Sequence, residues 1–466
     1  MDVALPSAFV QQMRSLLGSE YSDFEHALGS SAPISLRINR SKLAATPQLA
    51  AVAGHPDGYF LPERPSFTGD PWFHSGTYYV QEASSMSVAL PLAQHIDTQQ
   101  PLRVLDLCGA PGGKSTTLVN ALNEDSLLVT NEVVKARAQI LAENMTKWGA
   151  PNTVVTHTDP IQFQGLGEFF DVVVVDAPCS GEGLFRRDPA AREEWSPENV
   201  ALCSDRQRRI LSDIWPTVKP GGLLIYSTCT YNTLENEDNV AWMEEQLGAE
   251  SLLLTFPEAM PVKPSVRDGV AGYHFYPHHT VGEGFFLAAM RKPGHWAVST
   301  PGKLKKTKLT LAKKTELPAL QSWLLDSQTW DGFWQGDTLH AVPAHLLSAL
   351  DQLARHVYIV QAGLPAAERT KKHPNPSPNL ALSTALKPEV FPLYNLSLAE
   401  AQAYLMREPV LPAGAKPGWV RVGYEGQSLG WVKALPNRAN NYWPAAWRIR
   451  KTLTEDDQWS LRQLLP

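Results

Sequence analysis

RVLDLCGAPGGKST, at residues 103–116, sets an apolar segment directly before a glycine-rich loop and the first turn of a helix. Glycine tolerates tight turns, so Gly109, Gly112 and Gly113 let the backbone approach a ligand closely. The N-terminus of the following helix would then face that ligand. This order of strand, loop and helix predicts a ligand-binding turn at one edge of a sheet.

The next two hundred residues repeat the alternation of strand and helix. The run Val172–Val175 is uninterrupted and apolar, which is typical of a central strand covered on both faces. Such alternation predicts an α/β fold with a doubly wound, Rossmann-like parallel sheet that binds ligands at the carboxyl ends of its strands. Residues 275–291 contain two further strand-like segments that could add an antiparallel edge. Strands are predicted at 103–108, 127–132, 153–158, 170–176 and 223–228, and helices near 114–123, 133–148, 196–217 and 235–247.

The flanking regions have different patterns. Residues 1–95 form a predicted α+β RNA-binding domain, with helices at 9–17 and 21–28, a strand at 34–39 and an irregular segment at 59–76. We place the central α/β domain at 96–293.

Residues 294–380 are predicted to form a basic linker and a middle region. Six lysines fall within residues 303–314, a segment typical of a solvated linker. Residues 317–365 are rich in tryptophan and are interpreted as helical, and residues 374–378 are interpreted as a second linker. Residues 381–466 form a predicted β-rich module with basic and aromatic side chains.

The bulk composition fits a globular protein of several domains. The chain has 466 residues, 43% hydrophobic and 19% charged, with no apolar run long enough to span a membrane. Because residues 1–20 lack the basic start and apolar run of a signal peptide, we expect a cytoplasmic protein. Residues 1–300 hold 21 basic and 34 acidic side chains, whereas residues 301–466 hold 20 and 13. A basic C-terminal third is either a solubilising asymmetry or a surface for nucleic acid.

Acidic side chains end three successive predicted strands, at Glu132, Asp159 and Asp176. Acids at these positions can accept hydrogen bonds from a nucleoside, although each could instead cap a helix. As a set, they favour the nucleoside. The loop also resembles a phosphate-binding loop, which would require glycine where this chain has Cys108, so an NTPase stays an alternative.

Two of the four cysteines follow adjacent predicted strands. Cys179 lies in DAPCSGEG, residues 176–183, and Cys229 lies in STCTY, residues 227–231. Methylation of cytosine at C5 gives both thiols a role, because a thiolate that adds to C6 turns C5 into a nucleophile. The adduct must later lose the C5 proton and the thiol. A carboxyl such as Asp176 next to N3 would ease the addition.

These motifs resemble those of the Sun (Nol/Nop/Sun) family of RNA cytosine-5 methyltransferases. The resemblance covers roughly residues 30–293, and the two-cysteine signature is its most specific part. It implies a class I methyltransferase sheet and S-adenosylmethionine as cofactor. The matching segments are residues 33–39, 76–85, 106–114, 176–181, 186–189 and 227–230, together with Glu132.

The resemblance also implies roles for single residues. Cys229 would be the nucleophile and Cys179 would assist product release, with Asp176 and Lys114 completing the catalytic set. Family members usually carry Asp-Gly after the third strand, whereas this chain has Asp159-Pro160, which puts that contact in doubt. The expected cofactor contacts are Cys108, Gly109, Ala110, Pro111, Gly112, Gly113, Lys114, Glu132, Arg137, Asp159 and Asp176.

The C-terminal region is similar to the bacterial branch that modifies 16S rRNA. Residues 276–286 and 437–450 carry this similarity, and the tail resembles a PUA-like RNA-binding module. Trp443 and Tyr442 could stack on bases or simply fill the core of the module. The expected RNA contacts are Arg186, Arg187, Arg438, Arg448 and Arg450.

We therefore expect an S-adenosylmethionine-dependent RNA methyltransferase with 16S rRNA or the small ribosomal subunit as partner. A transfer RNA target and a non-catalytic RNA-binding subunit stay open as alternatives. Cys108, at the base of the glycine loop, and Cys203 are interpreted as structural. His74, His278 and His279 lack carboxylate or cysteine partners at ligand spacing in the sequence, so we expect no metal. We also expect no membrane association and a monomer.

Overall fold

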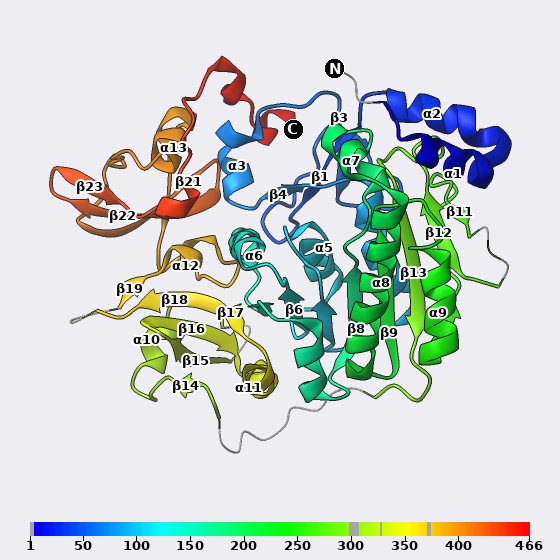
Figure 1. The fold of residues 1–466 in the computed structure, drawn as a ribbon. Helices are drawn as coiled ribbons and strands as arrows, with labels where there is room; N and C mark the ends of the chain where they lie inside the picture. Colours follow the sequence, from blue (N-terminus) through cyan, green and yellow to red (C-terminus); the bar gives the residue numbers. More distant parts are fainter. Residues whose placement is uncertain (1–3, 266, 268, 298–306, 327–328, 371–373) are drawn as a thin grey trace.

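A ten-stranded sheet forms the centre of the molecule (Figure 1). The computed structural model describes residues 4–265, 267, 269–297, 307–326, 329–370 and 374–466. The strand order is β11-β12-β13-β9-β8-β5-β6-β7-β17, with β10 also paired to β13. The five predicted strands are all present and mutually parallel, as β5 (Arg103–Asp106), β6 (Leu127–Asn131), β7 (Thr153–Thr156), β8 (Phe170–Asp176) and β9 (Val218–Thr228).

The predicted antiparallel edge is confirmed. β13 (Phe285–Arg291) pairs antiparallel with β9, and β12 (Gly272–Phe275) pairs antiparallel with β13. Two short strands that were not predicted extend this side, β10 (Glu250–Leu252) and β11 (Lys263–Pro264).

Helices cover both faces of the sheet. On one face, α8 (Pro197–Ile214) and α9 (Glu237–Leu247) pack against the strands, and on the other face α4 (Leu90–His95), α5 (Gly113–Ala121) and α6 (Lys135–Trp148) do so. Val173 and Val175 enter the first core, whereas Val172 and Val174 enter the second. The apolar run in β8 is therefore explained by burial on both sides.

The N-terminal region combines a helix pair with a small sheet. α1 (Ser7–Leu17) and α2 (Tyr21–Gly29) flank η1 (Gly18–Glu20) and pack through Phe9 and Phe24 against Phe185, Trp195 and Tyr231. The sheet order is β2-β3-β1-β4. These strands are β1 (Ile34–Ile38), β2 (Ala50–Ala51), β3 (Gly58–Leu61) and β4 (Tyr78–Val80). Between β3 and β4 lie η2 (Phe67–Gly69) and α3 (Pro71–His74), and η3 (Ser84–Ala89) follows β4.

The prediction of a helical middle region is wrong. It forms a five-stranded sheet of order β14-β15-β16-β18-β19, and the helices among its described residues include α10 (Leu317–Gln321), α11 (Leu347–His356) and the short η7 (Ala344–Leu346). Gly336, with φ +60°, turns the chain between the two long strands. The strands are β14 (Thr310–Leu311), β15 (Trp330–Gln335), β16 (Thr338–Pro343), β18 (Leu364–Glu368) and β19 (Asn375–Pro376).

Neither predicted linker is wholly a linker. Residues 374–378 enter β19 and the start of α12 (Pro378–Leu382), and the lysine-rich segment includes β14, although its residues 303–306 lie outside the described residues. The middle region also supplies β17 (Ile359–Ala362), which pairs antiparallel with β7 and forms the last strand of the central sheet. The two regions therefore share one sheet.

The C-terminal module is β-rich, as predicted. Its sheet has the order β20-β21-β22-β23, and the module packs beside the N-terminal region (Figure 1). Asp70, which is buried next to α3, accepts hydrogen bonds from Ser460 Oγ at 2.8 Å and from the Leu461 amide at 3.1 Å. The elements are β20 (Leu393–Asn395), α13 (Leu398–Leu405), β21 (Gly418–Tyr424), β22 (Gln427–Leu435), β23 (Arg438–Asn441), η8 (Ala445–Trp447), η9 (Glu455–Gln458) and η10 (Leu461–Leu464).

Within the described part of the chain, every helix is too short or too polar to cross a lipid bilayer.

Candidate active site

The glycine-rich loop joins β5 to α5 as predicted. A Cβ atom on Gly109 would lie 2.2 Å from Thr130 Oγ1 and 2.9 Å from Ser115 Oγ, so only glycine fits there. Asp106 ends β5 and accepts a hydrogen bond from Ser115 Oγ at 2.6 Å. Its other oxygen is buried without a partner among the described residues, and burial raises the pKa of Asp106 to about 7. The loop therefore leaves a buried acceptor free beside a closely approachable backbone.

Glu132 follows β6 and is buried beside this loop. One carboxylate oxygen accepts the Val134 amide at 2.8 Å, and the other lies 3.3 Å from Arg137 Nη2. Arg137 also donates to the carbonyl of Ala110 at 3.1 Å. Arg137 thus joins the acidic strand end to the glycine loop.

Asp159 behaves as a helix cap. Its carboxylate accepts the Ile161 amide at 3.2 Å at the start of η4 (Pro160–Leu166) and lies 3.4 Å from Arg209 Nη1. The capping alternative weighed for strand-end acids thus accounts for the contacts of this residue.

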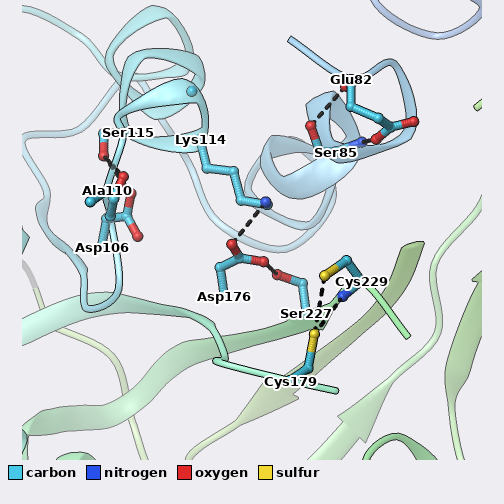
Figure 2. A network of polar contacts seen from close by, with 12 residues as sticks. Glu82, Ser85, Asp106, Ala110, Lys114, Ser115, Asp176, Cys179, Ser227 and Cys229 are labelled. Carbon is cyan, nitrogen blue, oxygen red and sulfur yellow. Dashed lines mark hydrogen bonds and ion pairs between the residues drawn. The ribbon is translucent and has the colours of Figure 1, made fainter. Parts of the chain in front are cut away.

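Lys114 and Asp176 form the polar centre of the site. Lys114 Nζ lies 2.8 Å from Asp176 Oδ2, and Ser227 Oγ donates to Asp176 Oδ1 at 2.9 Å. Burial opposes the charge on Lys114, but the Asp176 carboxylate outweighs it and raises the pKa of this ammonium. Figure 2 shows Lys114 reaching from α5 to the ends of β8 and β9.

The two predicted cysteines meet at these strand ends. Cys179 Sγ lies 3.1 Å from Cys229 Sγ, and the Cys229 amide points to Cys179 Sγ at 3.4 Å (Figure 2). The hydrogen bond with Cys229, together with burial, raises the pKa of the Cys179 thiol. Cys179 is therefore held in its protonated form next to Cys229.

A cleft of about 260 Å³ connects the glycine loop to Cys229. Gly109, Ala110 and Pro111 line one part, and Lys114 and Asp176 line the other. Several residues of its wall were not predicted from the sequence and come from the N-terminal region, from the loop before β13 and from the first residue of β13: Tyr79, Gln81, Glu82, Glu283 and Phe285.

Comparisons with known proteins agree over most of the chain. Family models match at residues 5–83 (N-terminal domain of 16S rRNA methyltransferase RsmF), 93–291 (16S rRNA methyltransferase RsmB/F) and 391–449 (methyltransferase RsmF PUA domain). Ribosomal RNA small subunit methyltransferase F from Salmonella paratyphi A is 31% identical, and the alignment covers 95% of this chain and 96% of that protein. The same values hold for the Salmonella newport protein.

The chain belongs to the ribosomal RNA small subunit methyltransferase F family.

Solved structures support the same fold. A methyltransferase homolog protein from Pyrococcus horikoshii is 26% identical with a TM-score of 0.53, covering 62% of this chain and 96% of that chain. NSun6 from Pyrococcus horikoshii, solved with SFG, has a TM-score of 0.54 over 63% of this chain and 99% of its own, at 20% identity. Membership of the methyltransferase F family decides against the NTPase alternative.

This methyltransferase uses S-adenosylmethionine, and the site fits that cofactor. The unpartnered Asp106 oxygen and the buried Glu132 carboxylate are acceptors for polar groups of a nucleoside. The absence of a Cβ at Gly109 keeps the loop close to Thr130.

The predicted RNA-binding residues of this methyltransferase lie in two places: Arg186 and Arg187 in the central domain, and the other three arginines on the C-terminal module. Arg186 donates to the Ser31 carbonyl at 2.7 Å and to the Gly282 carbonyl at 3.0 Å, so its guanidinium holds the chain together. Arg187 borders the cleft and lies 3.4 Å from Glu283. Arg438, Arg448 and Arg450 are exposed on the C-terminal module.

Trp443, which could either stack on bases or fill the core, is a core residue. Trp443 is 1% exposed and packs against Tyr404 and Trp447. Tyr442 is half-buried and lies edge-on to Trp419, with ring centroids 4.5 Å apart.

His278 and His279 have a carboxylate partner that does not stand at ligand spacing in the sequence. Glu20 approaches them from η1, with Oε2 at 3.4 Å and 2.8 Å from their Nε2 atoms. Lys263 Nζ lies 2.9 Å from the other oxygen of Glu20. Its hydrogen bond is the largest cause of the fall in the pKa of Glu20 to about 2. The partner was invisible in the sequence because it is far away along the chain.

Proposed function

We propose that this methyltransferase transfers a methyl group from S-adenosylmethionine to C5 of a cytidine in 16S rRNA. The observation that carries the proposal is the pair of sulfur atoms 3.1 Å apart beside the Lys114–Asp176 ion pair. Cys229 lines the same cleft as the glycine loop, so nucleophile and methyl donor would share one space.

In this proposal Cys229 acts first. Its thiolate adds to C6 of the cytosine, which breaks the aromaticity of the ring and makes C5 able to accept the methyl group. Asp176, held by Lys114 and Ser227, would bind the N3 edge of the base and stabilise the adduct. Lys114 keeps its charge in this site and balances the carboxylate.

Cys179 acts in the second half of the reaction. After methylation, the C5 proton leaves to solvent, and the electron pair of that C–H bond restores the C5=C6 double bond as the bond between Cys229 and C6 breaks. Cys179 lies in contact with Cys229 and stays protonated, so it is placed to assist release of the sulfur. The two cysteines would thus have different roles: Cys229 adds to the ring, and Cys179 assists the departure of the Cys229 sulfur.

S-adenosylmethionine supplies the methyl group from its sulfonium. The residues proposed to hold it are Cys108 to Lys114 together with Glu132, Arg137 and Asp176. Asp106 joins them because of its unpartnered oxygen. Asp159 is the weakest of the predicted contacts, since its carboxylate already caps η4.

The RNA would present its target as an extruded base. A cytosine in a stacked duplex cannot reach Cys229, so an unpaired or flipped cytidine is expected. Arg187 lies at the mouth of the cleft, and Arg438, Arg448 and Arg450 would contact phosphates. The named targets of the relatives, together with the PUA match, favour ribosomal RNA over transfer RNA. Such an enzyme would act in the cytoplasm.

The test uses the full chain with S-adenosylmethionine labelled in its methyl group. Naked 16S rRNA, assembled small subunits and bulk transfer RNA are offered separately, and the products are read by bisulfite sequencing. Label and bisulfite resistance at one or a few cytidines of 16S rRNA or of the small subunit are expected. Label in transfer RNA alone would overturn the proposed target. Label in 16S rRNA without bisulfite resistance at any cytidine would overturn the C5 position.

A further inference from the structure

Two buried glutamates tie the cysteine-bearing loops together. Glu182, on η5 (Glu182–Leu184), follows Cys179 closely, and its side chain crosses to the loop after β9. There Glu182 Oε2 accepts the amides of Tyr231 at 2.7 Å and Asn232 at 3.0 Å. The carboxylate of one loop thereby fixes the backbone just beyond Cys229.

Glu235 makes the reverse connection. It lies in the loop after Cys229, and its Oε2 accepts the amide of Ser180, the residue next to Cys179, at 3.0 Å. Gln207 of α8 donates to the same oxygen at 2.7 Å. Asn232 lies between the two glutamates and donates to Glu182 at 3.2 Å and to Glu235 at 2.8 Å. Each loop therefore holds the other through one carboxylate.

The chemistry of these contacts points beyond simple packing. Both glutamates are 0% exposed, and all the hydrogen bonds described here have the carboxylate as acceptor from an uncharged N–H or O–H group. Burying a carboxylate is costly unless several donors surround it. In return, charge-assisted hydrogen bonds are shorter and stronger than neutral ones and restrict geometry more tightly. Such bonds suit loops whose relative position matters.

We propose that Glu182 and Glu235 are positioning residues that hold Cys179 and Cys229 in register across the cleft through this reciprocal clamp. The inference rests on the proposed function of the two cysteines. It predicts that the clamp governs formation and release of the RNA adduct, whereas the glycine loop, which it does not touch, keeps its affinity for the cofactor.

The clamp also reaches the N-terminal region. Gln12 of α1 donates to Glu182 Oε1 at 3.0 Å, and Trp195 Nε1 donates to the same oxygen at 3.1 Å. Phe9 packs on Trp195 in the same cluster. A helix that belongs to the predicted RNA-binding part of the chain thus contacts the carboxylate that fixes the nucleophile loop.

The experiment compares Glu182→Gln and Glu235→Gln with Glu194→Gln, an exposed glutamate of α7 (Pro189–Glu194). The amide keeps the size but replaces one acceptor oxygen by a donor. Full-length variants are assayed for thermal unfolding, S-adenosylmethionine affinity, kcat and KM. Adduct formation is followed with RNA containing 5-fluorocytidine, from which C5 cannot lose a proton, so that the covalent complex accumulates.

Both clamp variants should lower kcat and the rate of adduct formation by about 30- to 100-fold, because a misplacement near 1 Å has effects of this size. The KM for RNA and the affinity for S-adenosylmethionine should change less than about threefold. The double variant should lose little more than either single one, since the two carboxylates act as a unit. Glu194→Gln should match the wild type.

Wild-type adduct formation in both variants would overturn the clamp while leaving the proposed function intact. If instead wild-type protein forms no adduct, or Cys229→Ala turns over normally, the proposed function itself fails. Should the glutamine variants fail to fold, Ser180→Ala decides: it keeps both carboxylates but removes the hydroxyl that donates to Glu235 and also contacts Thr230 Oγ1 and Asn232 Nδ2, and adduct formation should fall about threefold to tenfold. Unchanged adduct formation in that variant would also overturn the clamp.

Discussion

The two ends of the catalytic cleft are built in different ways. At the cofactor end, Asp106 binds Ser115 only nine residues away, and Glu132 binds the amide two residues on. At the cysteine end, Glu182 binds an amide 49 residues away and Glu235 one 55 residues away. A local motif specifies the first end, whereas tertiary contacts specify the second. The first can therefore be recognised in a short stretch of sequence, and the second only when the strands are side by side.

The sharpest way to separate the two ends is Cys229→Ala. Without the nucleophile no adduct can form, so turnover should fall by at least about 1,000-fold. Affinity for S-adenosylmethionine should stay within about twofold of wild type, because the glycine loop is untouched. Radiolabel transfer and calorimetry measure the two quantities. Serving as control, Cys203→Ala changes a buried cysteine of α8 that lies outside the cleft. Comparable losses in both variants would contradict the assignment.

Cys179→Ala tests whether the two thiols have distinct roles. Turnover should fall by about 100-fold, because a group that assists proton transfer is lost. A covalent RNA–protein complex should accumulate on denaturing gels during reaction with ordinary RNA, since Cys229 can still add but is released slowly. Absence of the complex at reduced turnover would place Cys179 in the first half of the reaction instead.

Gly109→Ala addresses the cofactor end alone. The added Cβ would lie 2.2 Å from Thr130 Oγ1, so the loop must shift. Overpacking of this kind costs about 1–3 kcal/mol, which corresponds to a roughly 5- to 150-fold weaker affinity for S-adenosylmethionine. Affinity for RNA should be unchanged. The matched control is Gly29→Ala, because open space surrounds the position of the added Cβ. Gly167→Ala would not serve, since the positive φ of Gly167 strains any other residue.

Asp106 gives the cofactor end a pH dependence. Burial raises its folded-state pKa to about 7, above the ordinary value of 3.8, so the folded state binds the extra proton. The contribution of Asp106 to stability should then be largest below about pH 4 and fall as the pH rises from about 4 to about 7. Asp106→Asn removes the charge, and in the absence of cofactor it should raise the Tm at pH 8 more than at pH 5. Asp205→Asn, exposed on α8, should show no such difference.

The smallest effects are expected far from the cleft. If each side chain contacts a phosphate, Arg448→Ala and Arg450→Ala should each weaken RNA binding by about twofold to fivefold. Each should also lower the slope of the logarithm of the binding constant against the logarithm of the salt concentration by about one. Filter binding at several salt concentrations measures both. kcat at saturating RNA should stay unchanged, and Arg206→Ala on α8 provides the comparison. A fall in kcat would instead connect the C-terminal module to the chemistry.

Much of the central fold could be predicted from sequence, for physical reasons. Strand and helix alternate with clear periodicity between residues 103 and 228, and the burial of β8 on both faces leaves a run of four valines. The prediction for the middle region was wrong because Trp330, Phe333 and Trp334 of β15 recur at spacings of three and four residues, which a helix face also allows. Periodicity alone does not resolve such short segments.

The candidate site divides in the same manner. The glycine loop, Glu132 and both cysteines stand in recognisable motifs, and the structure brings them to one edge of the sheet. Glu182 lies between two glycines within residues 176–183, and Glu235 lies six residues after Cys229. The hydrogen-bond partners of both carboxylates are far along the chain. A glutamate flanked by glycines next to a predicted catalytic cysteine was the available signal.

The position of β17 has a consequence for the order of synthesis. It completes the central sheet next to β7, yet it is encoded well after the last strand of the opposite edge. Until residues 359–362 have left the ribosome, β7 presents unpaired amides and carbonyls to other chains. A nascent or truncated polypeptide that stops after β13 would contain both cysteines and the glycine loop, but β7 would remain an unpaired edge strand. Maturation of this enzyme therefore waits for a segment that takes no part in the chemistry.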